Sequence, residues 1–66
     1  MTITLNGEST TWPGGSVADL VQHVTGQEDS AGVAVALNGQ VVPASQWDRA
    51  VSDGDSADIL LAVQGG

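Results

Sequence analysis

The sequence predicts a single α+β domain in which a mixed sheet of four to five strands carries one main helix across one face. Three observations predict this class. Asn-Gly dipeptides at two places join short stretches of residues that favour strands, which predicts β-hairpins. One run, Val17 to Val24, has apolar residues at helical spacing. After the last apolar stretch come Gly65 and Gly66, which we expect to form an extended tail because glycine adopts almost any backbone conformation.

The first twelve residues are predicted to form a β-hairpin. Ile3 and Leu5 alternate with polar residues, as in a strand with one buried face. Asn6-Gly7 is the strongest short signal for a hairpin turn, and residues 8–12 are rich in residues that favour strands. We therefore expect two antiparallel strands here, with Trp12 packed in or beside the core.

Residues 17–25 are predicted to form the helix. Ser16 is placed to cap its N-terminus, with Asp19 completing an acidic variant of the capping box. Gly26 stands where a C-terminal glycine cap belongs. The apolar stripe consists of Val17, Leu20, Val21 and Val24. A helix with one apolar side must pack on a sheet.

The second half of the chain is predicted to supply the remaining strands. Residues 33–37 alternate valine or leucine with alanine, and Asn38-Gly39 turns the chain into residues 40–42. A single helical turn is expected within the next few residues, capped by Ser45 and with Trp47 packed beneath it. Together these pieces lead to one more strand at the end of the chain.

The last strand is predicted to pair parallel with the first at the centre of the sheet. Its residues alternate between two faces, with Ile59, Leu61 and Val63 on one and Leu60 and Ala62 on the other. The order hairpin, helix, strand, short strand, turn and strand is typical of the ubiquitin-like β-grasp arrangement. We therefore expect one β-grasp domain over residues 1–64 and a flexible tail over residues 65–66.

Composition restricts the function of the chain. Its 66 residues have a formal net charge of −7, and Arg49 is the one basic side chain apart from a single histidine. Nucleic acid is excluded as a partner because too few cations are present to replace its counterions. The sequence has no apolar run of the roughly 18 residues that a membrane span needs and no basic start of a secretory signal, so we expect a cytoplasmic protein. We also expect the protein to be monomeric when free. There is no cysteine and no paired acid and base, so we expect no metal site and no enzyme.

Residues along the whole chain carry a resemblance to a known family. They are the turn Asn6-Gly7, the helix start Ser16 to Leu20, the segment Val35 to Pro43, Trp47, the turn Asp53-Gly54-Asp55 and the Gly65-Gly66 end. In this order and spacing they resemble the ThiS family, the ubiquitin-like sulfur carriers of thiamine biosynthesis. The resemblance implies that an adenylyltransferase related to ubiquitin-activating enzymes uses ATP and Mg²⁺ to adenylate the carrier. A sulfur donor system then makes a C-terminal thiocarboxylate, and thiazole synthase takes the sulfur.

The resemblance assigns chemistry to two residues. Gly66 is implied to carry the adenylate and then the thiocarboxylate, and Gly65 to thread into the active site of the partner. No catalytic residue, bound cofactor or metal is implied for the chain, which is a cosubstrate of its partners. Partner docking is expected on the outward side of the last strand and its acidic rim, at Leu60, Ala62, Asp55 and Asp58.

Other protein classes share part of this pattern. The small subunit of molybdopterin synthase is a sister sulfur carrier and is usually somewhat longer. A ubiquitin-like modifier has the same tail and activation but forms an isopeptide instead of a thioacid. A β-grasp interaction domain with an inert tail is a third alternative. An acyl-carrier protein is also small and acidic, but it is all-helical, which the β-rich pattern contradicts.

Overall fold

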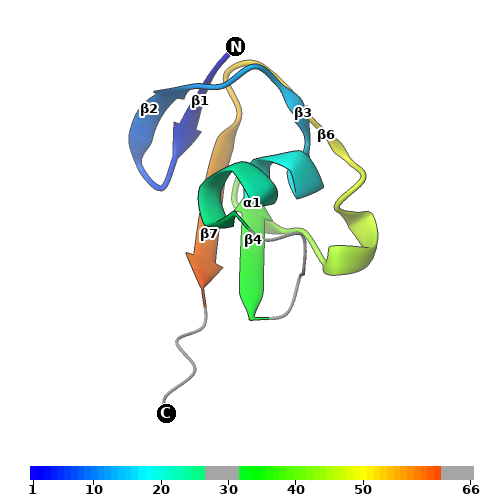
Figure 1. The fold of residues 1–66 in the computed structure, drawn as a ribbon. Coiled ribbons are helices and arrows are strands. Elements are labelled where there is room, and N and C mark those ends of the chain that lie inside the picture. Colours follow the sequence, from blue (N-terminus) through cyan, green and yellow to red (C-terminus); the bar gives the residue numbers. More distant parts are fainter. Residues whose placement is uncertain (27–31, 62–66) are drawn as a thin grey trace.

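The computed structural model describes residues 1–26 and 32–61. Its elements are β1 Thr2–Leu5, β2 Glu8–Thr11, β3 Gly15–Ser16, α1 Val17–Thr25, β4 Val33–Leu37, β5 Gln40–Val41, the 3₁₀ turn η1 Ala44–Gln46, β6 Ala50–Val51 and β7 Ser56–Leu61. The main sheet has five strands in the order β2-β1-β7-β4-β5, and α1 lies across one face of it (Figure 1). The predicted β-grasp fold, a mixed sheet with one main helix, is confirmed.

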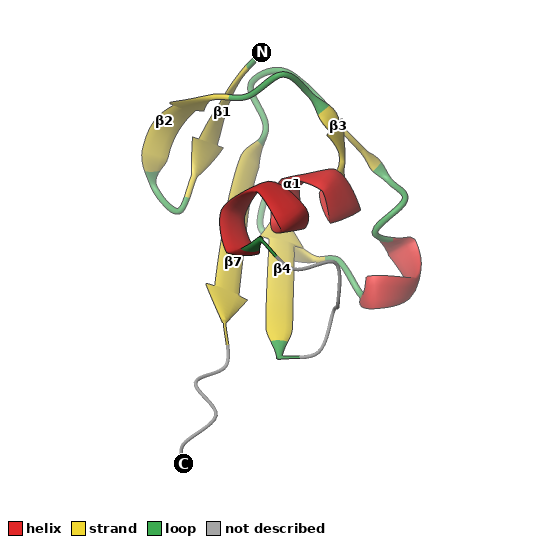
Figure 2. Cartoon of the chain, viewed as in Figure 1, coloured by secondary structure: helices red, strands yellow, loops and turns green. Residues whose placement is uncertain are grey.

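The last strand lies at the centre of the sheet, as predicted. β7 pairs parallel with β1, with Thr4 opposite Ser56 and Leu5 opposite Ala57. On its other side β7 pairs antiparallel with β4 over its full register from Ala57 to Leu61. The hairpin β1–β2 lies on one side of β7 and the hairpin β4–β5 on the other, and Figure 2 shows β1 and β4 as the direct neighbours of β7. The first strand and the last strand of the described chain therefore lie side by side in the middle of one sheet.

Both predicted hairpin turns are present, and their asparagines have a second role. Asn6 and Asn38 have φ values of 50° and 52°, in the left-handed region that asparagine tolerates better than most residues. The Asn6 side-chain oxygen accepts a hydrogen bond from the Ile59 N–H at 2.8 Å. The Asn38 side-chain oxygen accepts one from the Ser56 N–H at 2.9 Å. Each turn is thereby fastened to the central strand.

The helix has the predicted bounds and caps. The Ser16 hydroxyl accepts from the Asp19 N–H at 3.2 Å, and the Asp19 carboxylate accepts from the Ser16 N–H at 2.9 Å, which completes the capping box. Gly26 has φ 72° and donates to the Gln22 carbonyl at 2.7 Å. The predicted stripe is buried except at its end, where Val24 stays 37% exposed.

The core fills the space between α1 and the sheet. Its buried residues are Ile3, Trp12, Val17, Leu20, Val21, Val35, Leu37, Val42, Trp47, Val51, Ala57 and Ile59. Trp47 lies after η1 and donates its indole N–H to the Val42 carbonyl at 3.0 Å. The prediction that Ser45 caps the helical turn is wrong. Pro43 is the N-cap of η1, without a side-chain hydrogen bond, and the turn is closed by backbone bonds such as Gln46 N–H to the Pro43 carbonyl at 2.8 Å.

A small second sheet was not predicted. β3 and β6 pair Gly15 with Val51 and Ser16 with Ala50. Gly15 has φ 143°, and a Cβ there would lie 2.5 Å from an Asp19 carboxylate oxygen, so glycine is required beside the capping box. Among the described residues no helix is long and apolar enough to cross a membrane.

Candidate functional site

The candidate site is the C-terminal end of β7 and the residues that follow it. Gly65 and Gly66, the predicted chemical positions, lie outside the described residues, and so does Ala62. The structure therefore gives the base from which the tail departs. That base is the stretch from Ser56 to Leu61.

The start of β7 is held from both neighbouring strands. The Thr4 N–H donates to the Asp55 carbonyl at 2.9 Å, and the Asn6 N–H donates to the Ala57 carbonyl at 2.9 Å. From the other side, the Asn38 N–H donates to the Ser56 carbonyl at 2.7 Å. Ala57 is fully buried beneath α1. Because backbone hydrogen bonds on both sides and burial of Ala57 hold the start of β7, we expect this part of the strand to be a rigid base for the residues that follow it in the chain.

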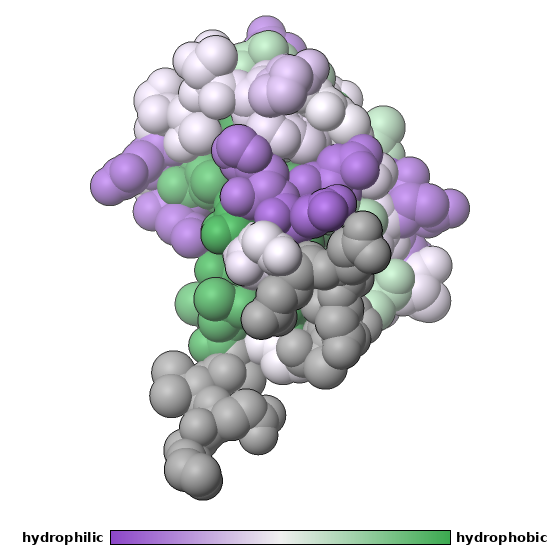
Figure 3. Space-filling model, in the orientation of Figure 1, coloured by the Kyte–Doolittle hydropathy of each residue, from purple (hydrophilic) through white to green (hydrophobic). Residues whose placement is uncertain are grey.

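The end of β7 presents apolar side chains to solvent. Leu60 is 70% exposed, on the face away from α1, and Leu61 is 54% exposed. A shallow apolar depression at this end of the sheet is lined by Gly32, Val33, Ala34, Leu60 and Leu61. Figure 3 shows apolar atoms gathered over this part of β7. An exposed apolar surface beside a functional terminus suits docking of a partner protein.

A further exposed apolar residue, Val41, was not predicted, and at 81% it is the most exposed large apolar side chain among residues 1–26 and 32–61. Val41 lies on β5 opposite Ala36, and Ala36 lies opposite Asp58. These three residues form one row across the outer face of the sheet. The sequence clue to the exposure of Val41 was its place on a short strand directly after the Asn38-Gly39 turn, at the edge of the sheet.

The two predicted docking carboxylates differ in their surroundings. Asp58 is exposed on the outer face, and none of the described residues is hydrogen-bonded to its carboxylate. Asp55 accepts from the Ser52 N–H at 2.8 Å and from the Asn38 side-chain amide at 3.1 Å. These two bonds, the Ser52 one first, lower the pKa of Asp55 below its ordinary value of 3.8. Asp55 also lies five residues before Leu60, or about 16 Å along the strand.

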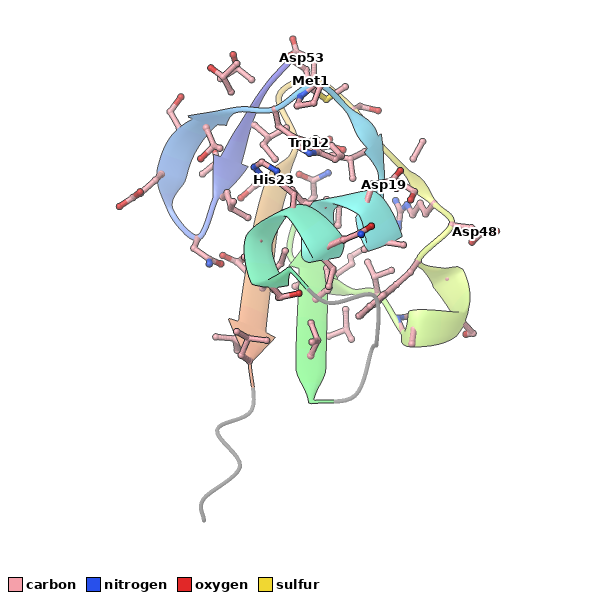
Figure 4. All side chains as sticks on the ribbon, viewed as in Figure 1. Met1, Trp12, Asp19, His23, Asp48 and Asp53 are labelled. Atoms are coloured by element: carbon pink, nitrogen blue, oxygen red, sulfur yellow. The ribbon has the colours of Figure 1, made fainter. Side chains whose placement is uncertain are left out.

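The other acidic side chains lie on separate elements. Asp19 belongs to the capping box of α1, and Asp53 accepts from the Thr2 N–H at 2.7 Å, near Met1 (Figure 4). Asp48 lies beyond η1, and His23 is exposed on α1 (Figure 4). Within residues 1–26 and 32–61 no three acidic or histidine side chains gather into a metal-binding group.

Fold and site together define the class of this protein. It is a small acidic ubiquitin-like β-grasp protein whose central strand leads towards a Gly-Gly sequence. The model of the ThiS family matches residues 3–66, and the chain therefore belongs to the ThiS family.

Solved structures agree with this assignment. The chain is similar to the crystal structure of the thiamine biosynthesis protein (ThiS) from Geobacter metallireducens, with 30% identity, a TM-score of 0.80 and 100% of both chains covered. It is similar also to the NMR solution structure of a thiamine biosynthesis protein from Geobacter metallireducens, with 30% identity and a TM-score of 0.82, over 100% of this chain and 88% of that one. A comparison with curated proteins gave no match.

Proposed function

We propose that this protein is a sulfur carrier of thiamine biosynthesis and that Gly66 bears the sulfur as a C-terminal thiocarboxylate. The observation that carries the proposal is the family match, which extends through residue 66 and so includes Gly65-Gly66. The absence of cysteine supports it, because sulfur on this chain cannot be held as a side-chain persulfide. The protein is then a cosubstrate of its partner enzymes.

The chemistry needs activation of a poor electrophile. The Gly66 carboxylate attacks the α-phosphorus of ATP on the partner, pyrophosphate leaves, and an acyl-adenylate forms. A sulfur nucleophile from the donor system then displaces AMP and leaves the thiocarboxylate, which thiazole synthase uses. Mg²⁺ bound by the partner neutralises the phosphates. Gly65 gives the tail a narrow cross-section, because glycine has no side chain to obstruct a tight channel.

The body of the protein presents the tail. β7 is held on both sides at its start, so a partner that binds the sheet near Leu60 receives the tail from a defined direction. We propose that Leu60 and Ala62 supply apolar contacts and that Asp58 and Asp55 attract basic residues of the partner. A net charge of −7 favours rapid association with a basic surface.

Intact mass spectrometry of the protein isolated from its native cells tests the proposal. The expected result is a species heavier by the difference between sulfur and oxygen, with fragmentation placing the change at Gly66. A matched control is a variant lacking Gly66, which should keep its fold and gain no sulfur. A free carboxylate that persists during thiamine starvation, while thiamine synthesis is required, would refute the sulfur-carrier role.

Two further measurements separate the alternatives. Deletion of the coding sequence should create a requirement for thiamine, whereas a molybdenum-cofactor defect would assign the chain to the sister carriers. Isopeptide-linked conjugates to other proteins, in place of a thioacid, would make it a modifier.

A further inference from the structure

On the edge of β7 that faces β1, the pairing position near Leu61 is occupied by none of the described residues. Along β7, alternate residues direct their backbone groups towards opposite neighbours. The Ser56 carbonyl is bonded to β4's end at Asn38, whereas the Ala57 carbonyl is bonded to Asn6 next to β1. Ala57, Ile59 and Leu61 therefore face the β1 side.

The Asn6 side chain ends the pairing between β1 and β7. In a parallel pair of strands, a residue donates its N–H to the carbonyl of one residue on the neighbouring strand. Its own carbonyl accepts from the N–H of the residue two positions further along that same neighbouring strand. Asn6 donates its N–H to the Ala57 carbonyl, but its backbone has turned away at φ 50°. Its side-chain oxygen replaces the carbonyl and accepts from the Ile59 N–H at 2.8 Å. The chain then reverses into β2.

The next position on this edge is empty among the described residues. It consists of the Ile59 carbonyl and the Leu61 N–H, which lie on the same side of β7 and which a single residue of a parallel strand would satisfy. β1 stops at Leu5, while β7 continues to Leu61 with β4 on its other side alone (Figure 1). Such an open edge is a template for an added strand.

The surroundings of this edge specify the chemistry of an added strand. A residue in the empty position lies level with Leu60, so its side chain packs beside Leu60 on the outer face, and the following residue lies beside Leu61. These two leucines are 70% and 54% exposed, so apolar partners would cover them. The chain has a net charge of −7, Asp58 is exposed on the outer face of β7, and the one arginine of the chain, Arg49, lies between η1 and β6. A basic residue on the added strand complements this charge.

We propose that the enzyme that adenylates Gly66 adds an extended strand, parallel to β7, at the Ile59–Leu61 edge, through two consecutive apolar residues and a flanking basic one. This inference rests on the proposed function and names how the partner recognises the base of the tail. Backbone pairing fixes the position of the tail along the strand axis, which apolar contacts alone do not do, because they tolerate sliding. An adenylation reaction needs that position fixed within a fraction of an ångström.

Amide-to-ester exchange at residue 61 tests the proposal without changing a side chain. A 66-residue chain is within reach of chemical synthesis by ligation. The ester removes the Leu61 N–H and also weakens the Leu60 carbonyl, on the β4 side, as an acceptor, so the control must carry the same ester linkage elsewhere. The matched control has the ester at Ser9, whose N–H points outward from β2 at the other edge of the sheet. We expect the residue 61 ester to bind the adenylating enzyme of the same organism about tenfold more weakly, and the Ser9 ester to bind like the unmodified chain. Equal affinity of both esters would overturn the proposal.

Amide hydrogen exchange gives a second readout. In the complex the Leu61 N–H should exchange at least about tenfold more slowly than in the free protein, while the Ser9 N–H should not change. An unprotected Leu61 N–H in the complex would overturn the proposal. Protection caused by self-association of the free chain would also overturn it, since a second copy of the chain would then be the occupant.

Adenylation of the unmodified chain is measured alongside by pyrophosphate exchange. If that activity is absent, the proposed function fails, and if it is present with both esters equal, the edge inference alone fails.

Discussion

Substitution of Asn6 should separate two contributions that one residue makes to stability. Asn6→Gly removes the side-chain acceptor of the Ile59 N–H but suits the positive φ of the turn. Asn6→Ala removes the same acceptor and also places an alanine at φ 50°. Loss of the hydrogen bond should cost about 1 kcal/mol, because water reaches this partly buried group and limits the penalty. The left-handed backbone should add about 1–2 kcal/mol in the alanine variant.

These costs correspond to measurable changes in thermal unfolding. At about 2.1 cal/mol/K per residue, a 66-residue chain has an unfolding entropy near 0.14 kcal/mol/K, so each kcal/mol lowers Tm by about 7 °C. We therefore expect Tm to fall by about 7 °C in Asn6→Gly and by about 14–21 °C in Asn6→Ala.

Circular dichroism melts, together with hydrogen exchange at the Ile59 amide, provide the assay. Exchange at Ile59 should accelerate in both variants by more than the loss of global stability explains. If the glycine and alanine variants melt together, the backbone argument is refuted. If Ile59 exchange follows global stability alone, the side-chain bond does not hold the strand.

Three further predictions concern the core and the pH response. Leu20→Ala should lower the free energy of unfolding by about 2–5 kcal/mol, which is most or all of the stability of so small a domain, because Leu20 is fully buried. Val24→Ala on the same stripe should lower it by less than about 1 kcal/mol, and equal losses in urea unfolding would contradict the helix packing. Trp47→Phe leaves the Val42 carbonyl without its indole donor and should cost about 1–3 kcal/mol by the same assay, so an unchanged midpoint would refute the role of that bond. Because folding lowers the pKa of Asp55, its carboxylate stabilises the folded protein above the ordinary pKa of 3.8, and this stabilisation is lost as the pH falls through the lower pKa of the folded state. Asp55→Asn should therefore flatten the curve of urea midpoint against pH between about pH 5 and 2, and an unchanged slope would contradict the contribution of Asp55.

Local patterns predicted the elements well because local physics decides them. The capping box at Ser16 and Asp19, the glycine cap and both Asn-Gly turns depend on residues within four positions of one another. The bond from Ile59 to the Asn6 side chain joins residues 53 positions apart, and no local pattern contains that information. Strands β3 and β6 have two residues each, too short for an alternating pattern to appear.

The candidate site was predictable in part. The outward position of Leu60 followed from alternation along the last strand, because the residues on either side of it belong to the opposite face. The attachment of Asp55 to Ser52 and Asn38 did not follow, since Asn38 lies in another hairpin. Docking at Leu60, Ala62, Asp55 and Asp58 and the chemistry of Gly65 and Gly66 stay predictions for the binding and mass experiments above.

The central place of β7 also determines when the edge at Ile59–Leu61 forms during folding. The hairpin β1–β2 and helix α1 form from neighbours in sequence, but β7 must join β1 across almost the whole chain, and such long closures slow folding. A partly folded chain, with hairpin and helix in place, still lacks the fixed strand and the edge beside Leu61. If the adenylating enzyme requires that edge, as proposed above, it acts only on molecules that have completed folding, and no ATP is consumed on chains that have yet to reach the native state.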